Sequence, residues 1–219
     1  MSRPIPDTPP PADLEEGDLV DRRDEQQFGR GLVIEPFLPN IVLAGGIHRR
    51  VATTEQKNRW LRPLIAGELQ AALAFAEPQG RFNPADISTV AKRVGDGFVL
   101  NGRKNLVLNG GNAALIIIPA RTSGEQKDRS GITLFALDGA AAGITRKPYR
   151  TVDGHRAADI SLDDVRVAQG SVLGEIGLGF DTLRSVMDEA TLAVSAEAVG
   201  IIRAMQDKTV EYTKNRVQF

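Results

Sequence analysis

The spacing of hydrophobic and polar residues changes along the 219 residues of the chain. Residues 1–27 combine few apolar side chains with many prolines and charges, which is typical of a disordered or loosely attached segment. Residues 28–70 and 175–219 carry apolar side chains at helical spacing, whereas residues 71–174 show short apolar runs between turn residues. The pattern therefore predicts an α+β protein with helices on both sides of a β region.

The segment before the β region contains one clear helix start. Thr53 or Thr54 can act as the N-cap, and Gln56 stands three residues after Thr53, which is the spacing of a capping box. Trp60 and the apolar residues that follow it fall on one helical face. Pro63 lies inside this pattern and predicts a kink or an early stop, because proline lacks a backbone N–H.

The β region has Gly, Asn and Asp at hairpin spacing, which predicts an antiparallel barrel or sandwich. Residues 115–119 are apolar throughout, so we expect this strand to be buried on both faces. Residues 95–111 carry three turn dipeptides: Asp96-Gly97, Asn101-Gly102 and Asn109-Gly110. Such dipeptides favour the tight turns of β-hairpins, so this stretch predicts two strands joined by a tight reversal.

The last segment, residues 177–219, predicts one long helix or two helices in line. Apolar side chains recur at steps of three and four, beginning with Phe180, Leu183 and Met187. Residues 206–219 are mostly polar, and the helix has no evident cap at its end. We therefore expect a truncated helical bundle whose apolar side associates with other helices.

Composition excludes several kinds of site. The net charge of −1 gives no long-range attraction to nucleic acid or to an anionic membrane. The absence of Cys excludes thiolate chemistry, and with only His48 and His155 a His-rich metal site is not expected. No apolar run has the length of a membrane span, and no secretory signal is visible. These features predict a cytoplasmic protein without nucleic-acid or membrane partners.

Seven short motifs occur in a fixed order from residue 74 to the end of the chain: AFAEPQG (74–80), DGFVLNGRKNLVLNGG (96–111), GITLF (131–135), DDVRV (163–167), VLG (172–174), GLGF (177–180) and RVQF (216–219). Together they resemble the acyl-CoA dehydrogenase family of flavoproteins, in particular members called small subunits. The resemblance covers residues 28–219. It implies a remnant of an N-terminal helical domain (28–70), a middle β-barrel domain (71–174) and the first long helix of a C-terminal helical bundle (175–219).

The resemblance also implies a chemistry. The family oxidises an acyl-CoA to a trans-2-enoyl-CoA: a carboxylate removes the α-proton and the β-hydride passes to FAD, which supplies the difficult step. It implies an oligomer and, as an electron acceptor, an electron-transfer flavoprotein. The catalytic Glu of most members lies beyond the position of Phe219. In some members it aligns with Ala190, so Glu189, which lies about 100° around the helix, is only a weak catalytic candidate and reads better as a surface or helix-pairing residue.

The resemblance places the flavin ring against two segments. In the first, Phe75 and Ala76 stand where the family has backbone contacts and a Thr hydroxyl. In the second, Leu106, Val107 and Leu108 replace a Trp-Ile-Thr motif. Because leucine cannot donate a hydrogen bond, these positions offer the flavin apolar contact and no hydroxyl. A buried apolar strand explains the same residues equally well.

Two arginines are implied as phosphate contacts. Arg81 replaces part of a Gly-Ser-Asp motif and could reach a CoA phosphate, or it could be an exposed loop residue. Arg216 and Phe219 match a motif that contacts the flavin pyrophosphate of a neighbouring subunit. Two functions stay open: an acyl-CoA dehydrogenase that is active in full-length or oligomeric form, with this chain lacking the catalytic Glu, or a non-catalytic partner subunit that completes the flavin and acyl-CoA site of another chain.

Overall fold

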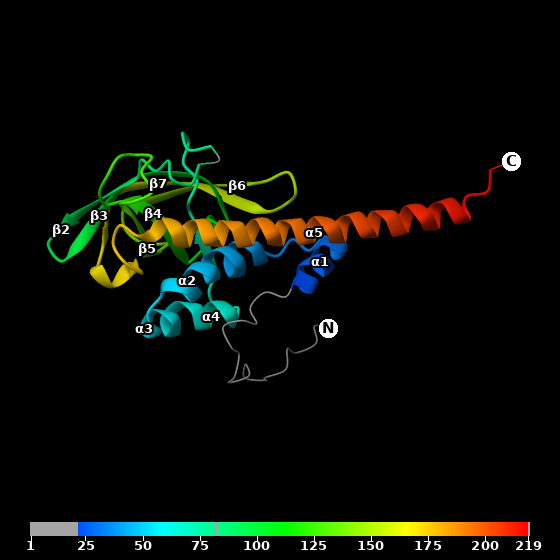
Figure 1. Cartoon of the computed structure of the whole chain (residues 1–219), viewed down its shortest axis with the longest axis horizontal. Coiled ribbons are helices and arrows are strands. Elements are labelled where there is room, and N and C mark those ends of the chain that lie inside the picture. The colour runs from blue at the N-terminus through cyan, green and yellow to red at the C-terminus, as the bar shows by residue number, and fades with distance from the viewer. Residues whose placement is uncertain (1–21, 82, 219) are drawn as a thin grey trace.

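The computed structural model describes residues 22–81 and 83–218 of the chain. One long helix, α5 (Gly179–Asn215), crosses the molecule and extends well beyond the other elements (Figure 1). It packs on strand β5 of the sheet and on helices near the N-terminus. Of the two predicted arrangements, one long helix or two helices in line, the structure has the single helix. No helix in the described part of the chain is long and apolar enough to cross a membrane.

The helices before the sheet are short and follow one another closely: α1 (Arg22–Gly31), the π-helical η1 (Leu38–Gly45), α2 (Gly46–Val51), α3 (Thr54–Gln56), the π-helical η2 (Lys57–Leu61) and α4 (Arg62–Ile65). The capping box at Thr53 is confirmed, since its hydroxyl accepts from the Gln56 N–H and the Gln56 side chain accepts from the Thr53 N–H. Pro63 stands at the start of α4, directly after the π-helical turn.

The expected loose segment, residues 1–27, lies mostly outside the described residues. Its last six residues begin α1, which packs on α5, so loose attachment does not hold for them. The two helices approach through glycines. A Cβ on Gly29 would lie 2.1 Å from the Glu197 carbonyl oxygen, and one on Gly200 would lie 2.0 Å from the Gln26 carbonyl oxygen. No larger residue fits at either contact while the helices stay this close.

The sheet contains β1 (Ala71–Leu73), β2 (Val90–Val94), β3 (Gly97–Leu108), β4 (Leu115–Arg121), β5 (Ile132–Asp138), β6 (Ile144–Arg150), β7 (Arg156–Val167) and β8 (Val172–Leu173); a short 3-10 turn, η3 (Gln169–Ser171), precedes β8. Its strand order is β6-β7-β3-β2-β4-β5-β8, with β1 beside β4. The α+β class is confirmed. The sheet is not closed into a barrel, and it is mixed, because β4 pairs in parallel with β1 and β2.

The predicted reversal at Asn101-Gly102 is wrong. Strand β3 runs straight through this dipeptide, and the chain reverses earlier, between Val94 and Gly97, which pair with each other. The pairing of β3 with β7 shifts register between Leu100 and Gly102 instead, as at a β-bulge. A Cβ at Gly102 would lie 2.4 Å from the Thr89 Oγ1. The glycine is therefore required by a close approach of the backbone and not by a turn.

Strand β4 separates two apolar clusters. Ile116 and Ile118 point to one face of the sheet and belong to a cluster formed mainly by the strands themselves. Leu115 and Ile117 point to the other face and belong to a second cluster, between the sheet and the helices. All seven residues of the strand are buried, which confirms that this strand is covered on both faces. The second cluster fixes α5 and the short helices against β1, β4 and β5.

Candidate active site

The family resemblance places two segments against a flavin ring, Phe75–Ala76 and Leu106–Leu108, and together we call them the wall. These two segments lie side by side in the structure. The Asn105 backbone N–H donates to the Ala76 carbonyl at 3.0 Å, which joins the segment after β1 to β3. Leu106 has a φ of 48° and exposes 52% of its surface. Its N–H donates to Asp159 Oδ1 at 3.2 Å, and the same oxygen accepts from the Tyr149 hydroxyl at 3.1 Å. These two bonds fix the Leu106 backbone, so its side chain stands out from the sheet.

The three residues from Leu106 to Leu108 point to different places. Val107 is 1% exposed and belongs to the cluster formed mainly by the strands. Leu108 is half-buried and lines a cavity at the end of β3. Phe75 and Ala76 are half-buried, and Phe75 packs on the cluster between the sheet and the helices. The wall thus presents Leu106 and Leu108 outward, with Val107 behind them.

Asn109 connects the end of β3 to the helices. Its side-chain Nδ2 donates to Asn40 Oδ1 at 3.1 Å, to Gln70 Oε1 at 3.0 Å and to the Ala71 carbonyl at 3.2 Å. Asn40 Oδ1 also accepts from the Ala71 N–H at 2.8 Å. A buried amide with its partners satisfied holds one geometry, so this network fixes the position of Leu108 relative to η1.

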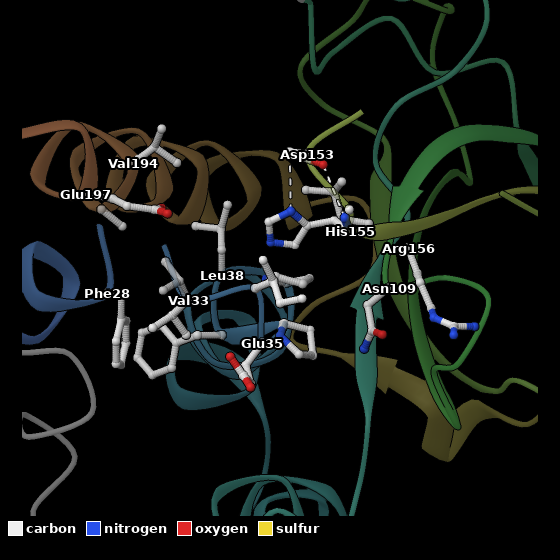
Figure 2. Close-up of a pocket in the computed structure, with 18 of the residues that line it drawn as sticks. Phe28, Val33, Glu35, Leu38, Asn109, Asp153, His155, Arg156, Val194 and Glu197 are labelled. Carbon is white, nitrogen blue, oxygen red and sulfur yellow. Dashed lines mark hydrogen bonds and ion pairs between the residues drawn. The ribbon is translucent and has the colours of Figure 1, made fainter. Parts of the chain in front are cut away.

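The cavity has a volume of about 530 Å³ and lies between the N-terminal helices, α5 and the β6–β7 connection (Figure 2). Segments far apart in the sequence form it, namely residues 25–42, 108–112, 150–156 and 193–197. Apolar side chains cover much of its surface, including Phe28, Val33, Leu38 and Val194. Its size is that of a site for a small organic molecule.

The connection between β6 and β7 contributes the polar groups on one side of the cavity. In Figure 2 the His155 ring lies between the helical residues and Asn109. Its Nδ1 is 3.2 Å from Asp153 Oδ2. The pKa of the Asp153 carboxyl is lowered, first by a hydrogen bond from the Thr151 hydroxyl and then by the His155 backbone N–H. The carboxylate thus holds this turn in shape.

A buried ion pair lies directly behind the wall. Lys104 Nζ is 2.7 Å from Glu77 Oε1, and Ser88 and Thr89 donate their backbone N–H groups to the same carboxylate. Burial alone raises the pKa of the Glu77 carboxyl. The Lys104 ammonium and the hydrogen bonds from Lys104, Ser88 and Thr89 outweigh that effect and lower the pKa to about 2. Glu77 is therefore a structural carboxylate and a poor proton acceptor.

Glu189 is held by two arginines of α2. The Arg49 guanidinium lies 3.0 and 3.1 Å from its two carboxylate oxygens, and Arg50 also donates to it. Ala190, where some family members have their base, packs on the cluster between the sheet and the helices. Glu189 thus pairs α5 with α2 and is not among the residues that line the cavity.

The remaining candidate residues lie apart from the cavity. Arg81 is exposed in the loop after Glu77 and has a φ of 49°. Arg216 follows α5 at its exposed end, and its guanidinium lies 5.3 Å from the centre of the Tyr212 ring. Phe219 is outside the described residues. The structure therefore brings together Phe75, Ala76 and Leu106, with Leu108 beside the cavity, and leaves both arginines elsewhere.

The wall fits a flavin by apolar contact and backbone geometry. Leu106 is an exposed apolar side chain, and next to it Asn105 Oδ1 is buried with no hydrogen-bond partner among the described residues. This combination suits a planar ring that carries both apolar surface and N–H donors. Leu106 and Leu108 offer no donor of their own. The described residues, 22–81 and 83–218, contain no group of three His, Asp or Glu side chains that could hold a metal ion.

Residues 72–165 match the family described as acyl-CoA dehydrogenase, middle domain. The chain is 36% identical over 172 residues to a 3-(aryl)acrylate reductase of Clostridium sporogenes, an alignment that covers 77% of this chain and 45% of that protein. It is 31% identical over 180 residues to the caffeyl-CoA reductase-Etf complex subunit CarC of Acetobacterium woodii, covering 81% of this chain and 47% of that protein.

The structure of butyryl-CoA dehydrogenase from Megasphaera elsdenii superposes with a TM-score of 0.84 and 29% identity, over 90% of this chain and 53% of that chain. The middle domain and this superposition define the class of protein. Residues 72–165 of the chain belong to the acyl-CoA dehydrogenase family as its middle domain, and the chain spans about half the length of the curated relatives it matches.

Sequence reasoning missed most of the residues that line the cavity. Phe28, Leu38 and Glu197 come from separate helices and meet only in the fold. One signal was available: Glu197 stands three residues after Val194, within the apolar stripe of the last helix. Charged side chains are uncommon on the packed face of a helix, so this position stands out. His155, which entered the sequence analysis only as one of two histidines too few for a metal site, also lines the cavity.

Proposed function

We propose that the chain forms one wall and the helical floor of an acyl-CoA dehydrogenase site, where an acyl-CoA thioester undergoes FAD-dependent α,β-dehydrogenation in the full-length or oligomeric form. One observation carries the proposal. The segment of Ala76 and the segment of Asn105 are hydrogen-bonded to each other, and strand β3, which contains Asn105 and Leu108, ends at an apolar cavity of ligand size.

The residues of this chain would hold the cofactor by packing. Phe75, Ala76, Leu106 and Leu108 would support the ring, while Arg216 and Phe219 would contact the pyrophosphate of a flavin in a neighbouring subunit. A bound flavin supplies the two-electron acceptor for the reaction. Arg81 would meet a CoA phosphate, because its planar guanidinium suits phosphate oxygens.

The proton acceptor of the reaction would come from outside this chain. Glu77 has a pKa of about 2 and is surrounded by donors, and Glu189 is held by Arg49 and Arg50. A base must reach the α-carbon with a free lone pair, so neither carboxylate suits the role. An electron-transfer flavoprotein would take the electrons, a proposal supported by the relative that is named as a subunit of an Etf complex.

Flavin binding by the purified chain tests this proposal. FAD fluorescence is titrated with the chain and with Leu106→Asp, which places a charge on the wall. The matched control is Val94→Asp, on an exposed valine of β2. We expect saturable quenching by the native chain and by the control, and about ten-fold weaker binding by Leu106→Asp. Equal binding by both variants, or none by the native chain, would overturn the proposal.

A second candidate is a non-catalytic partner subunit that completes the site of another chain. The pairing of Glu189 with arginines favours it, as does the exposed apolar surface on the outer half of α5, which includes Ile202 and Met205. If the chain serves another subunit, it is colourless alone and joins a yellow complex with a full-length relative. Arg216→Ala would then reduce the flavin retained by that complex, and unchanged retention would exclude the cross-subunit role.

A further inference from the structure

The cavity has two ends of different chemistry. At one end the rings of Phe28 and Phe37 meet edge to face, with centroids 5.0 Å apart and planes at 64°. Glu197 of α5 lies at the same end as Phe28 (Figure 2). Asn109 lies at the other end in Figure 2, and Leu108, which precedes it in the chain, also lines the cavity.

Glu197 is placed to act on a ligand. It is half-buried, it lines the cavity, and its carboxylate faces the space between α5 and residues 33–38 in Figure 2. Its backbone carbonyl marks the close contact with Gly29, which fixes this turn of α5 against α1. A second carboxylate, Glu25, lines the cavity from α1. The aromatic end of the cavity thus also carries the Glu197 carboxylate, a strong hydrogen-bond acceptor.

We propose that this cavity selects acyl groups that end in a hydroxylated aromatic ring. The ring packs on Phe28 and Phe37, and its phenolic hydroxyl donates to the Glu197 carboxylate. The thioester end then lies toward Leu108, beside the wall. The inference rests on the proposed function and adds the class of acyl group to it.

Other acyl groups match this end less well. A saturated chain would remove water from Glu197 and offer no donor in return, which is costly for a carboxylate. An acyl group that ends in a carboxylate would bring like charges together. A phenol offers both an aromatic face for the Phe28–Phe37 pair and an O–H donor, and hydrogen bonds to charged acceptors are stronger than neutral ones.

Calorimetric titration of the chain with three thioesters tests the inference: para-hydroxyphenylpropanoyl-CoA, phenylpropanoyl-CoA and octanoyl-CoA. We expect the hydroxylated ligand to bind about ten-fold more tightly than phenylpropanoyl-CoA. Equal or weaker binding of the hydroxylated ligand overturns the inference and leaves the proposed function standing. If none of the three binds, the proposed function falls as well.

A variant locates the selectivity. Glu197→Gln keeps the shape of the side chain and removes its charge, so the preference for the hydroxylated ligand should fall to about three-fold or less. The matched control is Glu211→Gln, on an exposed position of the same helix, which should keep the native preference. An unchanged preference in Glu197→Gln would show that the hydroxyl is recognised elsewhere and overturn the role of this residue.

Discussion

Lys104 Nζ lies 2.7 Å from Glu77 Oε1, and neither side chain has any exposed surface. Glu77 directly follows Ala76, and Lys104 directly precedes Asn105, so the ion pair joins the two segments of the wall from behind. Lys104 also donates to the Pro119 carbonyl of β4 at 2.7 Å. The position of the proposed flavin surface therefore depends on a charge pair in the core.

Removing the cation should destabilise the fold strongly. Lys104→Met leaves Glu77 buried and unpaired, so we expect the free energy of unfolding to fall by about 3–5 kcal/mol in urea titrations. Lys127→Met is the control. Lys127 is exposed and its Nζ lies 3.8 Å from Asp86 Oδ2, and an exposed ion pair of this kind contributes about 0–1 kcal/mol to stability. Similar losses in both variants would contradict the structural role of the buried pair.

The same pair predicts an acid-dependent stability. The pKa of Glu77 is about 2 in the folded protein against 4.5 for a free carboxyl, so the unfolded chain binds this proton more tightly. The contribution of Glu77 is therefore complete above pH 4.5 and is lost as the pH falls toward 2. It amounts to at most about 3 kcal/mol.

Urea titrations across this pH range check the acid dependence. Glu77→Gln should show a shallower fall in unfolding free energy than the native chain, whereas Glu175→Gln, at an exposed site, should follow the native curve. If Glu77→Gln keeps the native slope, another carboxylate is responsible.

The glycine contact between α1 and α5 should not accept a methyl group. The Cβ of Gly200→Ala would lie 2.0 Å from the Gln26 carbonyl oxygen, which forces the helices apart and carries Phe28 away from the cavity. We expect a loss of about 1–3 kcal/mol in thermal or urea unfolding. Gly170→Ala, in open space, is the control and should change stability little. A neutral Gly200→Ala would mean that α1 does not sit on α5 as described.

The wall should bind flavin more tightly when a donor is restored. Leu108→Thr places a hydroxyl where the family resemblance expects one, and one added hydrogen bond is worth about 0.5–1.5 kcal/mol. FAD titrations should then show about two- to ten-fold tighter binding. Val99→Thr, elsewhere on β3, should leave the affinity unchanged. Equal affinities for native chain and Leu108→Thr would place the ring away from Leu108.

Sequence patterns predicted the structure correctly where residues close together in the chain determine it. The capping box of Thr53 and Gln56 and the long helix from Gly179 follow from short-range pattern. The same kind of signal failed at Asn101-Gly102. There the backbone passes so close to Thr89 that glycine is needed inside a strand, and this contact joins residues far apart in the chain.

Part of the candidate site could likewise be predicted from the sequence, and part could not. The motif resemblance identified the two wall segments, and the structure places Ala76 against Asn105. The cavity was not foreseen, because Phe28, His155 and Glu197 are more than forty residues apart and meet only through the packing of α1 and the β6–β7 connection near α5. Periodicity reports one element at a time and carries no information on which elements meet. The cytoplasmic location and the oligomer stay predictions.

Hydrogen–deuterium exchange with and without FAD and phenylpropanoyl-CoA tests the central claim most directly, namely that the two wall segments and the cavity form one binding site. The account predicts slower exchange in residues 73–77, 104–112 and 150–156 when both ligands are present, with no change in β2 or in residues 163–167. Protection confined to other parts of the chain, or no protection at all, would contradict it.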